Sequence, residues 1–261
     1  MNILKDWKLQ TIALAIIALA EVIGKRQIGI VIFFPMLYAM IFGGIISLPK
    51  FKILDKKNMD YANVVMSVAL VLLVAKLGTS VGASWEKIIQ ATGALLLQEV
   101  GHFLGTIAIG LPFAVLLGMG REAVGATYSI GREPNIAIVE AKYGLDSPEG
   151  RGVMATYICG TLFGAVWMGI LASAIAGLDI LHPFALAMGA GVGSGSMLAA
   201  ASAPLIEYYP DLKAEIEGFA GTANLMSSVL GLYVYMFFSL PFASFLYDFL
   251  TRRKKQKAEQ Q

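Results

Sequence analysis

Two charged side chains stand in the middle of residues 121–142, a stretch flanked by strongly apolar sequence. They are Arg132 and Glu133, with Gly131 before them and Pro134 after them. Because proline lacks the amide donor and clashes with the preceding turn, we expect a helix to break here. Charges at mid-membrane depth are costly and by default mark a substrate, ion or proton site. A broken helix that carries them is how many secondary transporters build their binding site.

The types of these residues indicate an anionic ligand. The planar fork of donors on Arg132 matches both oxygens of a carboxylate. Glu133 would then act as a proton acceptor or counter-ion, and Ser129 and Asn135 would complete a substrate-binding site. The alternative is a re-entrant or interfacial loop in which Arg132 and Glu133 only pair with each other. The sequence leaves open whether 122–141 spans the membrane or re-enters it.

A second candidate is the glycine-rich run at 188–196, in the middle of an apolar segment. Several glycines so close together disfavour a continuous helix. An unwound backbone at Gly193, with the hydroxyls of Ser194 and Ser196, would offer polar groups to a substrate or ion. The glycines suit close packing of two helices equally well. No strand precedes the run, so it is not a dinucleotide-binding fingerprint.

A third candidate is formed by Gln98, Glu99 and His102. Glu99 and His102 lie three residues apart and therefore share one face of a helix. A histidine titrates near neutral pH, so the group predicts a site of proton or ion coupling. The alternative is a buried hydrogen-bonded pair that only fixes helix packing. A metal site would need more ligands than His182, the one other histidine, supplies.

An internal repeat, described below, places a polar layer opposite Glu99 and His102. Its members are Thr222, Asn224, Ser227, Ser228 and Gly231. Asn224 is included among the expected substrate-binding residues.

The composition indicates the elements that must position these groups. Of 261 residues, 57% are hydrophobic and 15% are charged, and the mean hydropathy is +0.70. Soluble domains carry about 25% charged residues, so we expect a polytopic membrane protein of the all-α class. The single cysteine, Cys159, excludes an internal disulfide. The N-terminal apolar stretch lacks a small-residue cleavage site and is expected to be a retained first span.

A transmembrane helix needs about 20 mostly apolar residues. On this criterion the sequence predicts eight segments, at 9–24, 28–49, 61–81, 85–118, 122–141, 152–177, 181–206 and 214–249. Residues 50–60 and the tail 251–261 are basic. The positive-inside rule then places both termini on the cytoplasmic side of the inner membrane.

The motif Leu-Pro-Phe-Ala occurs at 111–114 and again at 240–243. At the same offset Glu86 matches Glu215. These identities predict two related halves, 1–120 and 121–261, which is a common construction in transporters. The sequence leaves open whether the repeat is parallel or inverted.

Four runs of residues resemble a known family. They lie at 5–9, 35–39, 120–135 and 142–154, and the run at 120–135 is the most specific. On them the chain resembles the bacterial integral membrane family called domain of unknown function 3100, over nearly its whole length. That resemblance implies a membrane protein and supplies no activity or substrate.

A looser resemblance rests on the runs at 191–196 and 217–221. Both are similar to the antiholin-like protein B family, which is linked to movement of small organic acids. The histidine usual in that family's glycine-rich run is absent here.

Together these features predict a secondary transporter, or permease, for a small organic anion. No nucleotide-binding loop is present, so a proton or Na⁺ gradient is the expected source of energy. The sequence lacks a complete nucleophilic triad or metal set, so we expect no enzyme activity, cofactor or metal. The bilayer is the expected partner, nucleic acid is not, and a homodimer is left open. The alternative is an antiholin-like pore-forming or regulatory membrane protein.

Overall fold

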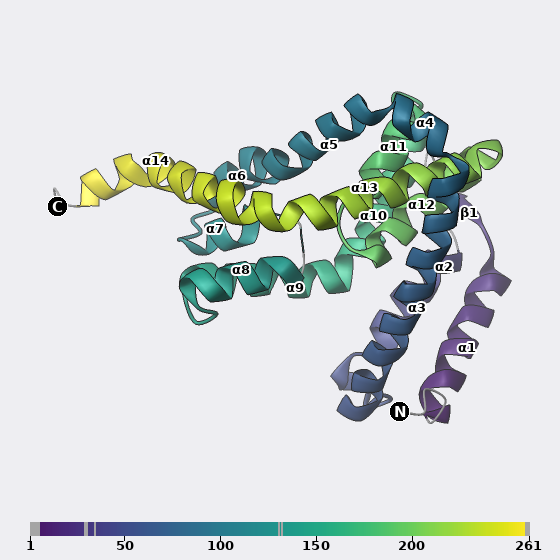
Figure 1. The fold of residues 1–261 in the computed structure, drawn as a ribbon. Helices are drawn as coiled ribbons and strands as arrows, with labels where there is room; N and C mark the ends of the chain where they lie inside the picture. The colour runs from purple at the N-terminus through teal and green to yellow at the C-terminus, as the bar shows by residue number, and fades with distance from the viewer. Residues whose placement is uncertain (1–5, 29–30, 34, 130, 132, 259–261) are drawn as a thin grey trace. The chain divides into compact units, whose positions relative to one another are not determined.

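The computed structural model describes residues 6–28, 31–33, 35–129, 131 and 133–258, and the chain is helical over most of this part (Figure 1). One exception to the expected all-α fold is a small antiparallel hairpin. Its strands are β1 (Arg26–Ile28) and β2 (Val31–Phe33), paired so that Arg26 lies opposite Phe33. The expected segment 28–49 is therefore divided between this hairpin and a short helix.

The chain forms two compact units that do not coincide with the expected halves. Unit 1 comprises residues 1–89, 162–191 and 195–221. Unit 2 comprises residues 90–161, 192–194 and 222–261. Each unit therefore takes segments from both sides of the expected boundary at residue 120.

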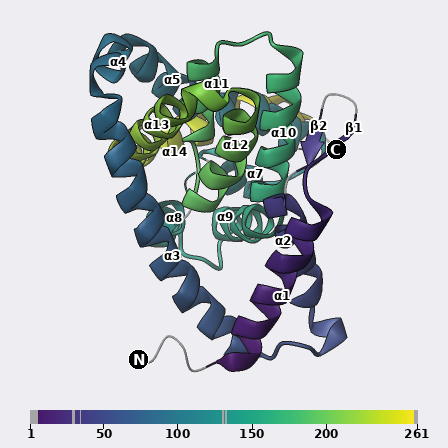
Figure 2. The same cartoon turned by 90° about the vertical axis from the view of Figure 1, so that its right-hand side faces the viewer.

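The helices of unit 1 are as follows: α1 (Trp7–Ile23), α2 (Pro35–Ile46), η1 (Pro49–Phe51), α3 (Lys56–Ala83), α4 (Trp85–Gln90), α10 (Ala165–Leu178), α11 (Pro183–Ala190), α12 (Gly195–Tyr208), η4 (Pro210–Leu212) and the first part of α13 (Lys213–Val234). Figure 2 shows α10 and α12 side by side. Gly169 allows this close packing, because a Cβ there would lie 2.8 Å from the Leu37 side chain and 3.2 Å from the carbonyl oxygen of Ala200.

The N-terminal ends of α1 and α3 are capped and joined. Asp55 and Asn58 form a capping box at the start of α3. Asp6 caps α1 and also accepts a hydrogen bond of 2.6 Å from the Asn58 side chain. That bond, together with the one from the Leu9 amide, lowers the pKa of Asp6 below its ordinary value. The two helix ends are therefore held at one end of unit 1.

Polar contacts fasten α3 to α13. Lys76 Nζ donates to Glu217 at 2.6 Å, and Ser80 Oγ donates to the other oxygen of that carboxylate at 2.9 Å. Gly218 faces Ser84 and Gly221 faces Leu77, where added Cβ atoms would be crowded. The small residues thus bring two long helices close together around one ion pair.

The helices of unit 2 are α5 (Thr92–Gly105), η2 (Thr106–Gly110), α6 (Leu111–Leu116), α7 (Glu122–Thr127), α8 (Glu133–Tyr143), α9 (Pro148–Cys159), the remainder of α13, η5 (Tyr235–Ser239) and α14 (Leu240–Ala258). The π-helix η3 (Gly160–Gly164) follows α9. Tyr128, Ile107, Leu111, Val139 and Leu240 lie at the centre of the unit's core and are fully buried.

Three helices in the described part of the chain are long and apolar enough to cross a membrane. They cover Lys56–Ala83, Thr92–Leu116 and Pro210–Arg252, with 28, 25 and 43 residues. They correspond to the expected segments 61–81, 85–118 and 214–249. The expected segments 122–141 and 181–206 are each divided into two shorter helices. These spans support a membrane protein, while the described helices do not establish eight crossings.

Both Leu-Pro-Phe-Ala motifs begin directly after a five-residue π-helix, η2 at 106–110 and η5 at 235–239. Pro112 and Pro241 each remove an amide donor from the helix, and a π turn accommodates the carbonyl left without its partner. One offset, 129 positions, relates both the motifs and the π-helices. The two segments also run in the same direction within unit 2 (Figure 1).

The runs at 120–135 and 142–154 pack against each other as α7 and α9. Arg121 Nε donates to Glu149 at 2.6 Å, and Arg151 donates to Glu122 at 2.8 Å, so the two ion pairs cross between the helices. A Cβ at Gly125 would lie 1.9 Å from the carbonyl oxygen of Glu149. The same atom at Gly152 would lie 2.0 Å from the carbonyl oxygen of Glu122. Only glycine allows this approach.

We therefore expect Gly125→Ala to destabilise the protein by about 1–3 kcal/mol or more, because backbone must shift to admit the methyl group. The matched control is Gly101→Ala in α5, where an added Cβ meets nothing within 4 Å. That change should be neutral or stabilising by up to about 1 kcal/mol. Thermal unfolding of the purified variants measures both. Equal melting temperatures for the two variants would contradict the proposed close packing.

Candidate functional site

A chain of four polar side chains is buried in unit 2. Ser227 Oγ donates to Glu99 Oε1 at 2.7 Å, and the other oxygen of Glu99 lies 3.4 Å from His102 Nδ1. His102 Nε2 lies 3.2 Å from the Tyr235 hydroxyl. Glu99 is only 2% exposed, and the other three are also buried. Both titratable groups are thus enclosed between hydrogen-bonding neighbours.

The helical period explains the first half of this chain. Glu99 and His102 are three residues apart on α5 and face the second part of α13, where Ser227 lies. Gln98, the third member of the expected group, is only partly buried. Within the described part of the chain its Oε1 is buried without a hydrogen-bond partner. The structure therefore joins Glu99 and His102 directly and leaves Gln98 beside them.

Tyr235 was not identified from the sequence. It begins the π-helix η5, and its ring packs edge-on against Phe103 and Tyr128. A Cβ at Gly131 or at Gly231 would lie 2.8 Å from this ring. Two glycines far apart in the sequence therefore make the space that the ring occupies. A glycine four residues before a buried tyrosine is the only local signal that the sequence offered.

The helix expected to break near Pro134 breaks a few residues earlier. α7 ends at Thr127, and α8 begins at Glu133, so Asn135 is helical. The reason is that proline is well tolerated in the first turn of a helix, where its missing amide needs no partner. The break expected between Gly131 and Pro134 therefore includes Gly131, while Pro134 and Asn135 are helical.

Side chains satisfy the backbone of this break. Ser129 Oγ accepts from the Gly131 amide at 3.0 Å, and Asn135 Nδ2 donates to the Gly131 carbonyl at 2.6 Å. The Tyr128 hydroxyl donates to the Asn135 carbonyl at 2.7 Å. Gly131 lies against the Tyr235 ring, which links the break to the buried chain. Arg132 lies outside the described residues, as does the side chain of Glu133, so their roles stay predictions.

The glycine-rich run is also broken. α11 ends at Ala190 and α12 begins at Gly195, so the unwound part is shorter than the glycine-rich run at 188–196. Gly193 has φ of 97°, a conformation that favours glycine. Its carbonyl accepts from Asn224 Nδ2 at 3.1 Å. Asn224 and Ser227 are one turn apart on α13, so both lie on the same face of this helix. The break at Gly193 and the buried carboxylate of Glu99 therefore contact one face of α13.

The two serines of the run fall in different units. Ser194 belongs to unit 2 with Gly193, whereas Ser196 lies in α12 and belongs to unit 1. Both have interacting neighbours. Of the expected site residues, unit 2 therefore brings together Gly193 with Asn224 and Glu99 with His102, and it contains Ser129 and Asn135 beside the break at Gly131.

Several buried polar atoms of unit 2 have no hydrogen-bond partner among the described residues. They are Gln98 Oε1, Thr106 Oγ1, Asn135 Oδ1 and Ser239 Oγ. Most buried polar atoms in native proteins are paired, so each such atom calls for a ligand, an ion or water. The donors and acceptors here are amides and hydroxyls. In the part of the chain that the structure describes, no group of three or more histidine, cysteine or carboxylate side chains could hold a metal ion.

A family model described as "Protein of unknown function (DUF3100)" matches residues 18–249 of the chain. This match confirms the resemblance to domain of unknown function 3100 and covers most of the chain, while it lends no support to the antiholin-like similarity. No curated protein and no solved structure matched the chain.

The buried hydrogen bond between Ser227 and Glu99 leads to a prediction about stability. Ser227→Ala removes a donor from a buried carboxylate and should cost about 1–3 kcal/mol of unfolding free energy. Ser228→Ala is the matched control, because that exposed hydroxyl donates only to the Asn224 carbonyl of its own helix. Its effect should stay within about 0.5 kcal/mol. Denaturation of both variants in detergent tests this, and a neutral Ser227→Ala would show that the bond contributes nothing.

Proposed function

We propose that this chain, which belongs to the DUF3100 family of proteins of unknown function, is a secondary transporter, or permease, that moves a small organic anion across the membrane. A proton gradient is the proposed source of energy, and Na⁺ is the alternative coupling ion. The proposal includes no enzymatic reaction, cofactor or metal. Its partners are the bilayer and the transported anion.

The buried chain from Ser227 through Glu99 and His102 to Tyr235 is the observation that carries the proposal. Its members lie on two helices that are long and apolar enough to span a membrane. Ionisable groups buried in such helices are costly and by default functional. An imidazole can donate a proton from one nitrogen and accept one at the other, so the pair can relay a proton. The hydroxyls of Ser227 and Tyr235 extend the pair on both sides, which suits proton transfer along the chain.

The class of substrate rests on the sequence and on the nearby breaks. Arg132 stands between Gly131 and Glu133 in the sequence, and an arginine fork suits a carboxylate. Ser129 and Asn135 bond the backbone of neighbouring Gly131. Glu133 is its proposed counter-charge or proton acceptor. The break at Gly193 and Ser194 supplies backbone groups of the kind that transporters use for substrates and ions. Asn224 on α13 donates to the Gly193 carbonyl in this break.

The proposed membrane arrangement is a multi-pass protein of the inner membrane with eight crossings and cytoplasmic termini. Related halves are supported by the two π-helices that precede the Leu-Pro-Phe-Ala motifs at one offset. The two segments that carry these motifs run in the same direction, and this favours a parallel repeat over an inverted one.

Glu99→Gln tests the coupling. Glutamine keeps the shape and hydrogen bonds of the side chain and cannot exchange a proton. A screen of small carboxylic acids by thermal shift first identifies a ligand, because a ligand that binds the folded state raises its stability. In proteoliposomes, Glu99→Gln should lower uptake driven by a pH gradient about tenfold or more, with ligand binding nearly unchanged.

Glu140→Gln, at an exposed position on α8, is the matched control and should transport like wild type. Unchanged pH dependence in Glu99→Gln would reassign the pair to helix packing. Leakage of the ligand that never saturates would instead favour the antiholin-like pore over a transporter.

Arg132 is tested by three variants. Arg132→Lys keeps the charge and loses the planar fork, so carboxylate binding should weaken about tenfold. Arg132→Ala should bind less still and express poorly, because Glu133 loses its nearest counter-charge. Arg132→Ala with Glu133→Ala should recover expression without recovering transport. Uptake at the wild-type level in the double variant would show that the two residues only neutralise each other.

A further inference from the structure

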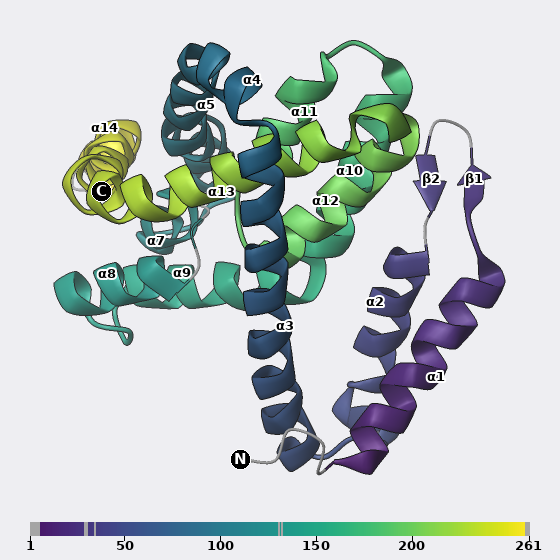
Figure 3. The same ribbon diagram turned by 45° about the vertical axis from the view of Figure 1, so that its right-hand side comes forward.

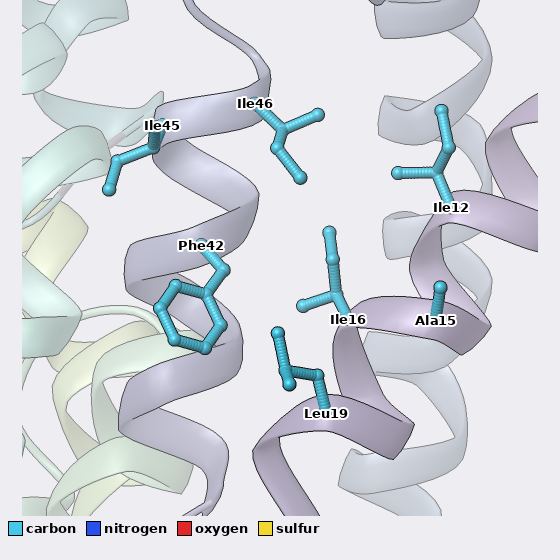
Figure 4. Close-up of a pocket in the computed structure, with 7 residues that line it drawn as sticks. All are labelled: Ile12, Ala15, Ile16, Leu19, Phe42, Ile45 and Ile46. Atoms are coloured by element: carbon cyan, nitrogen blue, oxygen red, sulfur yellow. The ribbon is translucent and has the colours of Figure 1, made fainter.

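A groove between α1 and α2 in unit 1 is lined entirely by apolar side chains and has a volume of about 350 Å³. Ile12, Ala15, Ile16 and Leu19 contribute from α1. Phe42 and the adjacent pair Ile45 and Ile46 contribute from α2 (Figure 4). Figure 3 shows the two helices side by side, joined at one end by the β1–β2 hairpin. No polar group in the groove would satisfy a polar ligand, so its occupant must be hydrocarbon there.

One end of this groove is basic. Lys8 precedes Ile12 by four residues and therefore lies on the groove face of α1, one turn beyond the lining. Lys50 follows Ile46 by four residues, in the turn that leaves α2. Both lysines are exposed. A charged residue thus follows the apolar lining of each helix at the same end.

The link between the ends of α1 and α3 holds this basic end together. Asp6 bonds Asn58, which places the start of α1 beside the start of α3. The lysines at this end are Lys8, Lys50, Lys52, Lys56 and Lys57. Three aspartates lie here, Asp6, Asp55 and Asp60, and the carboxylates of the first two are bonded at helix N-termini. The positive charge therefore remains in excess.

We infer that the groove binds one anionic phospholipid. An acyl chain lies between Ile16 and Phe42, and the phosphate lies between Lys8 and Lys50. Lysines near an anionic headgroup attract it electrostatically, whereas a zwitterionic headgroup gains little. The site lies in unit 1 and is independent of the transport proposed from unit 2. The bound lipid would fix the basic end of α1 and α2 at the cytoplasmic surface of the membrane.

The preference for an anionic headgroup is tested by measuring which lipids the purified full chain retains in detergent. Native mass spectrometry should show dioleoyl phosphatidylglycerol retained about tenfold more tightly than dioleoyl phosphatidylcholine. Lys8→Gln with Lys50→Gln should abolish that preference. Lys142→Gln with Lys213→Gln removes the same charge at other exposed positions and should leave the preference intact. Equal retention of the two lipids by wild type, or a preference unchanged in Lys8→Gln with Lys50→Gln, would overturn the inference.

Two alanine variants test the groove. Ala15→Phe fills it and should lower phosphatidylglycerol retention at least fivefold. Ala13→Phe adds the same ring to an exposed position on α1 outside the groove and should change nothing. Equal retention by these two variants would show that the acyl chain binds elsewhere and would overturn the proposed site.

Discussion

The pairing of the Glu99 carboxylate inside apolar helices is the constraint on which unit 2 depends. A buried charge without partners is strongly unfavourable, so both oxygens must be met within the protein. Ser227 meets one and His102 approaches the other. His102 then needs a partner for its second nitrogen, and Tyr235 provides it. Each requirement fixes the next side chain, so the register between α5 and the second part of α13 follows from one carboxylate.

The π-helix and the glycines are consequences of the same constraint. Pro241 disturbs the helix in the turn before it, and the resulting π-helix begins at Tyr235. Gly131 and Gly231 leave room for the tyrosine ring, and the break that contains Gly131 is satisfied by side chains. Irregular backbone at membrane depth is tolerated only when it is buried in this way. The break and the buried chain therefore form one packed structure.

Interactions between residues that are close in sequence were predictable, and those between distant residues were not. The period of a helix placed Glu99 and His102 on one face, and the count of glycines predicted a break near Gly193. Tyr235 was missed because a π turn changes the helical period and because Gly131, which makes its space, is distant in sequence. Windows of apolar residues found the three long helices. They overestimated the length of the helices at 122–141 and 181–206, since hydropathy does not distinguish one long helix from two short ones joined by a break.

The tripeptide Gly-Arg-Glu occurs twice, at 120–122 and at 131–133, and the structure describes the contacts of the first copy. Arg121 forms ion pairs with Glu149 and Asp248, and Glu122 forms one with Arg151. Glu149 and Arg151, which face α7 from the neighbouring run at 142–154, are therefore already paired. The proposal gives the arginine of the second copy, Arg132, a different counter-charge. An anionic substrate supplies that charge in the proposed transporter, which is why the two copies of one motif are assigned different roles.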